Sequence, residues 1–451
     1  MTEPAALVLA RWAVGLEFAA LPEPVVAAAR RHLADAVGCA VAGIRREAVG
    51  PALTVAAGLG GPPEARLFTG ERVGAVAAGF GNAVAVHALD YDDTHPGGLV
   101  HASAVVVPPA LALAEQTGSR GSELIAALVA GLEVVCRLGA AAPHGFHARG
   151  LHATSMCGPV AAAVTAGRLL GLSSTEMAHA IGIAASGASG LLEFLHGPAS
   201  TKQLHPGTAV ANGILAARLA AAGATGPAGA LDGPFGLFRA LAGREPDLPV
   251  LLGELGERWE TTRIAVKLFP ACQLAHTSIE AARAFAGNGS LPERVTVTLH
   301  PDSIPIIAGA DKRRPRSSYE AKFSVYWCVA SAIVDGQVGL DTFERLDRPD
   351  VLALAGRIVV RTGAGDGPAA SAPGIVVASG RQSIFPIPRA LRSVLPAGYP
   401  LLSAGVDAAP ERDIRAKAIA NLGSGAGEVL AAIDSGASAA DLLDAIEGCL
   451  Q

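Results

Sequence analysis

The feature that most constrains the fold is a long succession of apolar segments with helical spacing. In residues 24–44 apolar side chains recur every three to four positions, whereas Arg30, Arg31 and Asp35 occupy the other face. The same period recurs in residues 73–89, 104–116, 122–138, 158–170, 174–189 and 207–222. Up to Trp259 there is little of the alternation that marks strands. The sequence therefore predicts an all-helical domain in this part of the chain.

Small side chains dominate these segments. The chain is 51% hydrophobic and only 17% charged, and it contains 54 glycines. Small residues let helices approach one another closely, so we expect a helix-rich body with a face of low charge that forms a homodimer.

A second pattern begins near residue 265. Residues 294–300 alternate as a half-buried strand does, and residues 357–361 and 374–378 have the same character. Residues 320–335 and 341–346 are predicted to be helical. From Pro410 onward the period is helical again, and this tail is able to pack on the first domain. We therefore expect a smaller α/β domain between two helical parts.

Charge and cysteine usage exclude several classes of partner. The net charge is −5 without a stripe of Lys or Arg, and aromatic residues make up 4%, so a nucleic-acid interface is not expected. The six cysteines form no CxxC pair, which fits reduced thiols. No apolar run of about 20 residues and no basic leader is present, so we expect a cytoplasmic protein without membrane partners.

Two generic motifs carry little weight. Gly363-Ala-Gly365-Asp-Gly367 leads into a proline-rich stretch instead of a helix, so it predicts a turn and not a nucleotide loop. Gly197-Pro-Ala-Ser-Thr-Lys202 lacks the ending of a phosphate-binding loop, and no G-x-S-x-G motif exists.

The polar cluster between Asp90 and His101 is more informative. A calcium loop would need Gly and Glu where His95 and His101 stand. Carboxylates and imidazoles are legitimate ligands of a transition metal, so that interpretation stays open. The residues alone leave an active site and a solvated turn that caps the next helix equally open.

Several further polar motifs follow in a fixed order. The set comprises Leu89-Asp-Tyr-Asp-Asp-Thr94 with His101, Gly145-Phe-His147, Thr201-Lys-Gln-Leu-His-Pro-Gly207, Val266-Lys-Leu-Phe-Pro-Ala271 with His276, Glu320-Ala-Lys-Phe-Ser324 and Gly336-Gln-Val-Gly-Leu-Asp341. In this order the motifs resemble the segments of the MmgE/PrpD family, which includes 2-methylcitrate dehydratase, cis-aconitate decarboxylase and iminodisuccinate epimerase. The resemblance covers nearly the full chain, and its specificity lies in the ordered set.

The resemblance implies a mainly α fold with an α+β part. It implies a large all-helical domain of residues 1–264, completed by 405–451, and an inserted α/β lid of residues 265–404. It also implies a homodimer and an active site between the domains, without metal or cofactor. The order of helical, mixed and helical periodicity agrees with this arrangement, and domain interfaces are common places for small-molecule clefts.

The matching motifs also imply the site residues. Catalytic roles are expected for Asp90, His101, His147 and Lys202. Substrate contacts are expected from Thr94, Lys267, Tyr326, Trp327 and Cys272.

At several positions the sequence departs from the family. Trp327 stands where relatives carry tyrosine, with Tyr326 beside it, and Cys272 stands where some carry histidine. Gln203 and Thr208 stand where many relatives carry arginine. Fewer cations in the pocket would suit a substrate with fewer carboxylates than methylcitrate, or one that is held differently.

The residue types suit chemistry at a carbon next to a carboxylate. Such chemistry needs a positioned base and stabilisation of the developing negative charge. A neutral imidazole suits the base, because its unperturbed pKa is about 6.5. Lys202 and Lys267 can neutralise carboxylates, Asp90 can orient a histidine, and Thr94 can donate a hydrogen bond.

We therefore expect a metal-independent lyase that dehydrates or decarboxylates a small polycarboxylic acid. An epimerase that uses the same pocket is one alternative, because elimination and epimerisation share their first step. A homologue that binds ligands without catalysis is the other.

Overall fold

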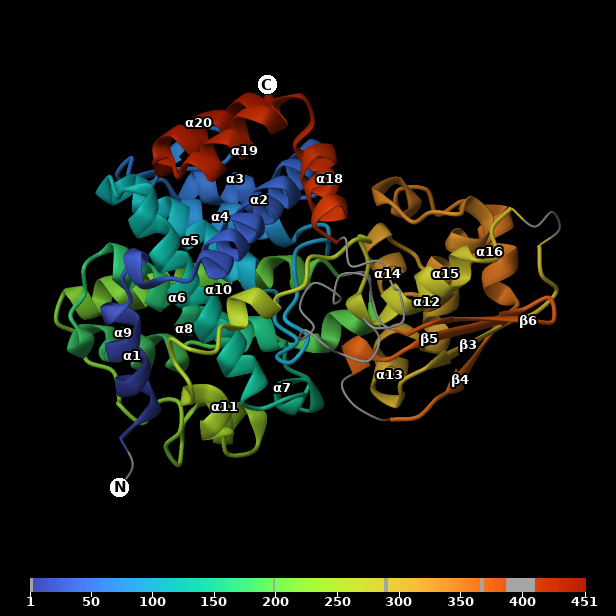
Figure 1. Ribbon diagram of the computed structural model, residues 1–451, viewed down its shortest axis with the longest axis horizontal. Coiled ribbons are helices and arrows are strands. Elements are labelled where there is room, and N and C mark those ends of the chain that lie inside the picture. The colour runs from blue at the N-terminus through green and yellow to red at the C-terminus, as the bar shows by residue number, and fades with distance from the viewer. Residues whose placement is uncertain (1–2, 198, 288–290, 366–368, 387–409) are drawn as a thin grey trace.

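This computed structural model describes residues 3–197, 199–287, 291–365, 369–386 and 410–451. Its buried apolar side chains form two clusters. The first draws on residues 5–264 and 422–449, and the second on residues 269–378. We call these parts the helical body and the α/β body, and Figure 1 shows them beside each other. The chain is thus mainly helical with small sheets, as the periodicity predicts.

The helical body is centred on five helices, α4, α5, α6, α8 and α10, which pack on one another. Its helices up to residue 252 are α1 (Ala5–Gly15), α2 (Glu23–Arg45), α3 (Gly50–Leu59), α4 (Ala75–His87), α5 (Ala102–Thr117), α6 (Gly121–Ala140), α7 (Gly145–Ala148), α8 (Ala153–Leu169), α9 (Ser174–Ser186), α10 (Thr201–Ala221) and α11 (Leu248–Leu252). A short hairpin of β1 (Ala65–Arg66) and β2 (Arg72–Val73) lies beside them.

The helices predicted for the helical body are all present, with some starts displaced. Helix α10 begins at Thr201, whereas the sequence predicts a start at Gly207, because Pro206 and Gly207 interrupt the helical pattern without ending the helix. This earlier start places Lys202 in the first turn of α10.

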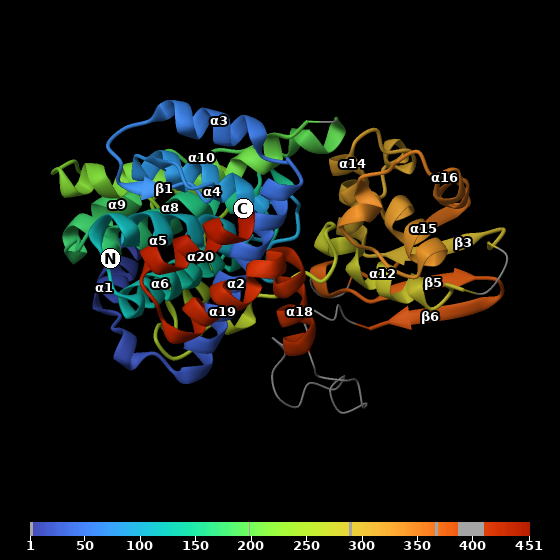
Figure 2. The ribbon, with the colours of Figure 1, turned by 90° about the horizontal axis from the view of Figure 1, so that it is seen from above.

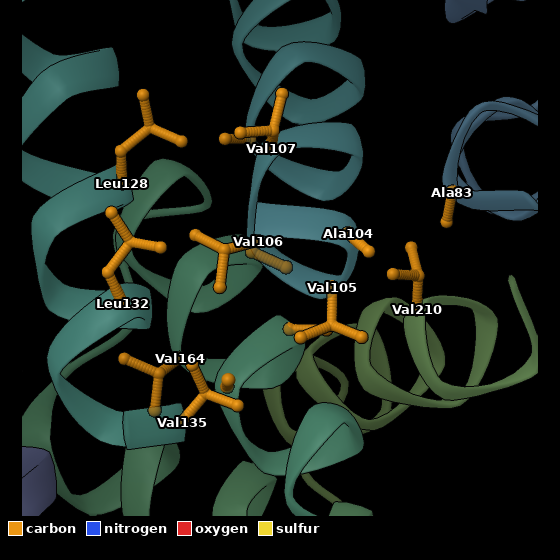
Figure 3. Close-up of a cluster of buried hydrophobic side chains, with 14 of the residues drawn as sticks. Ala83, Ala104, Val105, Val106, Val107, Leu128, Leu132, Val135, Val164 and Val210 are labelled. Carbon is orange, nitrogen blue, oxygen red and sulfur yellow. The ribbon is translucent and has the colours of Figure 1, made fainter. Parts of the chain in front are cut away.

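Small residues bring the central helices together. A Cβ atom on Gly213 of α10 would lie 2.4 Å from the Cβ of Ala162 on α8, and one on Gly131 of α6 would lie 2.1 Å from Thr165 Oγ1. Neither position has room for a larger side chain. Figure 3 shows valine, leucine and alanine side chains filling the space between these helices. The expectation of close helix contacts is confirmed.

Among its described residues, the α/β body contains a four-stranded sheet of order β4-β3-β5-β6. Strands β3 (Val295–Leu299) and β4 (Ile358–Thr362) are parallel, with Val295 opposite Ile358. Strand β5 (Gly374–Ala378) runs antiparallel to β3 and to β6 (Arg381–Phe385). The first three strands match the prediction, whereas the edge strand β6 was missed because Arg381, Gln382 and Ser383 are polar.

Helices cover one face of this sheet (Figure 2). They are α12 (His276–Arg283), α15 (Val325–Asp335) and α16 (Pro349–Gly356), and the shorter α13 (Ile304–Ile307) and α14 (Ser318–Lys322) lie nearby. The single helix predicted for residues 320–335 is in fact two helices, α14 and α15. The break occurs because Ser324 Oγ accepts a hydrogen bond from Trp327 N and caps a new helix. The helix predicted for residues 341–346 is a 3₁₀ turn, Leu340–Phe343.

The last three helices return to the helical body. They are α18 (Pro410–Leu422), α19 (Ala426–Ser435) and α20 (Ala439–Leu450), and α18 packs against α2 (Figure 1). Both ends of the chain therefore contribute to one core. Among the described helices, none is long and apolar enough to cross a bilayer.

Candidate active site

A cavity lies where the two bodies meet. The helical body contributes most of the polar side chains together with several apolar ones, and the α/β body contributes mainly apolar ones. The residues that line the cavity are Asp90, Thr94, Leu99, His101, His144, His147, His152, Leu192, Phe194, Leu195, Lys202, Lys267, Cys272, Gln273, Leu274, Ile306 and Phe323.

Asp90 forms the charged centre of this cavity. It follows α4 in a left-handed backbone conformation with φ of 50°. Its Oδ1 accepts a hydrogen bond from Lys202 Nζ at 2.6 Å and another from Lys267 Nζ at 3.0 Å. All three side chains are at most 4% exposed. Burial by itself would raise the pKa of Asp90, but the charges of the two lysines outweigh it and hold this pKa below its usual value.

His101 stands at the start of α5 with one ring nitrogen fixed. Its Nδ1 lies 3.0 Å from the carbonyl oxygen of Asp93, and because a carbonyl only accepts, Nδ1 carries the proton. This leaves Nε2 with a free lone pair, 3.9 Å from Asp90 Oδ1. Burial, followed by the charges of Lys202 and Lys267, holds the pKa of His101 well below its usual value. The imidazole is therefore neutral at neutral pH.

The neighbouring carboxylates of Asp92 and Asp93 bind other residues around the cavity. Asp93 accepts hydrogen bonds from the backbone N–H and the hydroxyl of Ser103 in the first turn of α5. Asp92 Oδ2 lies 2.8 Å from His87 Nδ1. The sequence interpretation gave Asp90 the task of orienting a histidine. In the structure it is the backbone of Asp93 that orients His101, and Asp90 binds the two lysines.

His152 was not among the predicted residues, yet its ring centroid lies 5.9 Å from that of His101. It stands at the start of α8, and its Nδ1 lies 3.1 Å from Nδ1 of His205, so one of these rings donates to the other. Burial, and then the charge of Lys202, hold the pKa of His152 well below its usual value. A signal existed in the sequence, because His101 and His152 each directly precede an apolar helix.

The imidazoles form a group with the spacing of metal ligands. One nitrogen each of His87, His101 and His152 lies within 4.8 Å of the others, and the same holds for one atom each of Asp90, Asp92 and His101. The sequence left a transition-metal site open for the segment that holds Asp90, Asp92 and His101. It did not indicate the histidine set, because His152 comes from a distant segment. The histidines are neutral and His87 Nε2 is buried without a hydrogen-bond partner among the described residues, so these atoms could hold a transition metal.

His147 lies on the outer side of the cavity, on α7. It lines both this cavity and a second one beside it, and its ring centroid is 6.4 Å from that of His152. Burial, followed by His144 and Lys202, lowers the pKa of His147 to about 4.

The structure does not bring two of the predicted contact residues to the cavity. Tyr326 and Trp327 lie in the first turn of α15 and point into the core of the α/β body. Tyr326 donates its hydroxyl to the carbonyl of Ala308 at 2.8 Å, and Trp327 Nε1 donates to the carbonyl of Thr342 at 3.2 Å. Cys272, in contrast, lines the cavity, and burial raises the pKa of its thiol.

The positions where relatives carry arginine also lie outside the lining. Gln203 Nε2 donates to the carbonyl of Ala88, and Thr208 is exposed on α10. The inference of a pocket with fewer cations therefore loses its basis, because neither side chain lines the cavity.

Comparisons with known proteins agree with the motif order. The model of the MmgE/PrpD N-terminal domain matches residues 8–248, and that of the MmgE/PrpD C-terminal domain matches residues 269–364. Cis-aconitate decarboxylase from Aspergillus terreus is 30% identical over 378 residues, which cover 78% of this chain and 76% of that protein. Cis-aconitate decarboxylase from Mus musculus is 32% identical over 62% of this chain and 59% of its own length. The protein of the same name from Homo sapiens is 28% identical over 76% of this chain and 74% of its own length.

Proposed function

The chain belongs to the MmgE/PrpD family, and from this premise we propose that it is a lyase that decarboxylates a small unsaturated polycarboxylic acid of the cis-aconitate type. The observation that carries the proposal is the cluster of two buried lysine ammonium groups on the single carboxylate of Asp90, beside neutral imidazoles. The names of the relatives given above indicate that those proteins act on the same class of acid. The α/β body acts, in this proposal, as a lid over the cavity. Residues 387–404 of the lid predicted from the sequence lie outside the described residues.

Charge explains why a polycarboxylate suits this cavity. Lys202 and Lys267 contribute two positive charges and Asp90 contributes one negative charge, while burial keeps the neighbouring histidines neutral. These three side chains therefore carry one net positive charge between them. In a site of low polarity, their two ammonium groups attract an anion more strongly than they would in water. The apolar side of the cavity, with Leu274, Ile306 and Phe323, suits the carbon skeleton.

The same charges can control a proton. Before substrate binds, the positive charges of the two lysines disfavour protonation of His101. When substrate carboxylates pair with the ammonium groups, they offset that effect, and the pKa of His101 rises toward its ordinary value. His101 Nε2 can then accept a proton and deliver it to carbon.

A decarboxylation follows from these parts. The bond between the departing carboxylate and its carbon breaks, carbon dioxide leaves, and the electron pair is delocalised through the double bond toward a neighbouring carboxylate. Lys202 and Lys267 stabilise this enediolate-like charge. The imidazolium of His101, with His152 beside it, then gives one proton to carbon. In total one proton is taken up and one carbon dioxide is released.

The first prediction concerns the reaction. Purified protein incubated with cis-aconitate is expected to release one equivalent of carbon dioxide and to leave an unsaturated dicarboxylic acid, measured by trapped gas and by NMR. A product formed by addition or loss of water, without release of carbon dioxide, would instead indicate a hydratase or dehydratase. Deuterium incorporation from solvent without net reaction, in a dicarboxylate with a stereocentre, would indicate an epimerase.

The second prediction is that the reaction needs no metal. Proton transfer to and from His101 requires free imidazole nitrogens, and a metal held by His87, His101 and His152 would occupy them. Activity is therefore expected to survive dialysis against EDTA and to fall when zinc is added. Loss of activity with EDTA and its recovery with a divalent metal would show that the histidine group is a catalytic metal site.

A further inference from the structure

The turn that carries Asp90 is held by lysines from three separate parts of the chain. The carbonyl of Leu89 accepts a hydrogen bond from Lys322 Nζ at 2.5 Å. The carbonyl of Asp90 accepts one from Lys267 Nζ at 2.9 Å, and that of Tyr91 accepts one from Lys417 Nζ at 2.6 Å. Three consecutive carbonyls are thus each fixed by an amine group.

Such support matters because of the backbone at Asp90. A residue with a side chain rarely adopts a positive φ, and it persists there only when its surroundings hold it. The direction of the Asp90 side chain depends on this conformation, and so do the positions of the ammonium groups of Lys202 and Lys267, which share its Oδ1. Any group that holds the turn therefore acts on both cations.

Lys322 differs from the other lysines at this turn. Lys267 is paired with Asp90 and Lys417 with Asp35, whereas no carboxylate among the described residues lies within ion-pair distance of Lys322. Lys322 is 3% exposed, and burial lowers its pKa to about 7. A buried amine with a carbonyl as its hydrogen-bond acceptor contributes little to stability, because its desolvation is costly.

The hydrogen bond from Lys322 to Leu89 joins the two bodies. Lys322 is the last residue of α14, in the α/β body, whereas the turn belongs to the helical body. We propose that Lys322 is a positioning residue, which sets the Asp90 turn through the carbonyl of Leu89 and makes the geometry of the two cations depend on the docked α/β body. The part of this inference that concerns catalysis rests on the proposed function.

Lys312 provides a matched control. It also belongs to the α/β body, is 7% exposed, and donates its Nζ to a carbonyl of the helical body, that of Leu195, at 2.9 Å. It therefore crosses the same junction with the same kind of bond, but it does not contact the Asp90 turn. A general role in holding the two bodies together would be shared by both lysines.

The test compares Lys322→Met, Lys322→Arg and Lys312→Met in the full chain. Hydrogen–deuterium exchange is expected to be about tenfold faster or more in a peptide spanning residues 88–94 for Lys322→Met, and unchanged there for Lys312→Met. With cis-aconitate, Lys322→Met should lower kcat by about tenfold or more with KM within about threefold, because misplacement of catalytic groups affects the chemical step. Lys322→Arg, which keeps a charged donor, should recover most of kcat and of the protection.

The outcomes separate this inference from the proposed function. If wild-type protein does not convert the acid, the proposed function fails, and the exchange measurement still decides whether Lys322 holds the turn. Unchanged exchange at residues 88–94 in Lys322→Met would overturn the inference. Equal losses of kcat and of exchange protection in Lys322→Met and Lys312→Met would overturn it as well. If Lys322→Met does not fold, the shorter and polar Lys322→Gln takes its place with the same expected pattern.

Discussion

Replacing His101 with alanine is expected to lower kcat by about 100-fold or more, the usual contribution of a positioned general acid or base. The reason is its geometry, because the bond from Nδ1 to the carbonyl of Asp93 directs the free Nε2 toward Asp90 and the cavity. Steady-state kinetics of His101→Ala, together with circular dichroism and a thermal melt, would measure the effect in a folded protein.

A control variant separates this effect from the general loss of a histidine. His179 lies on α9, bonds to Gly226 through Nδ1 and does not line the cavity. His179→Ala is expected to keep kcat within about threefold of wild type. A His101→Ala enzyme with nearly normal kcat would remove His101 from the mechanism, and the neighbouring His152 would become the leading candidate for the proton carrier.

Replacing Asp90 with asparagine is expected to lower the free energy of unfolding by about 3–5 kcal/mol, because it leaves two buried ammonium groups facing each other without a counter-charge. Chemical denaturation at neutral pH would measure this loss. Activity should disappear as well, since the cations lose the carboxylate that places them. Equal stability of variant and wild type at neutral pH would contradict this account of the cluster.

Two further measurements test the electrostatic cause. The pKa of Asp90 is lower in the folded chain than its ordinary value of about 3.9, so its stabilisation is fully present above that pH and declines as the pH falls below it. The difference between wild type and Asp90→Asn should therefore be largest at neutral pH and shrink in acid. The double variant Asp90→Asn/Lys202→Met should recover part of the lost stability, because it removes one of the two repelling charges.

Local patterns in the sequence determined most of the secondary structure and much of the chemistry. Apolar spacing predicted the helices around Val106 and Leu128, and β-branched alternation predicted β3, β4 and β5, because both periods depend only on neighbouring residues. The ordered motifs also selected side chains that the fold brings into one cavity. These are Asp90, Thr94, His101, His147, Lys202, Lys267 and Cys272.

Only the tertiary structure decided which of these side chains are partners. Asp90 lies 112 residues from Lys202 and 177 from Lys267, and no local pattern connects positions so far apart. The sequence could not place Trp327 either, because the direction of its side chain depends on the cap at Ser324 that starts a new helix. Periodicity determines which residues form a helix, whereas a side chain in a turn takes its direction from distant residues that satisfy its charge and hydrogen bonds, and these contacts exist only once the chain has folded.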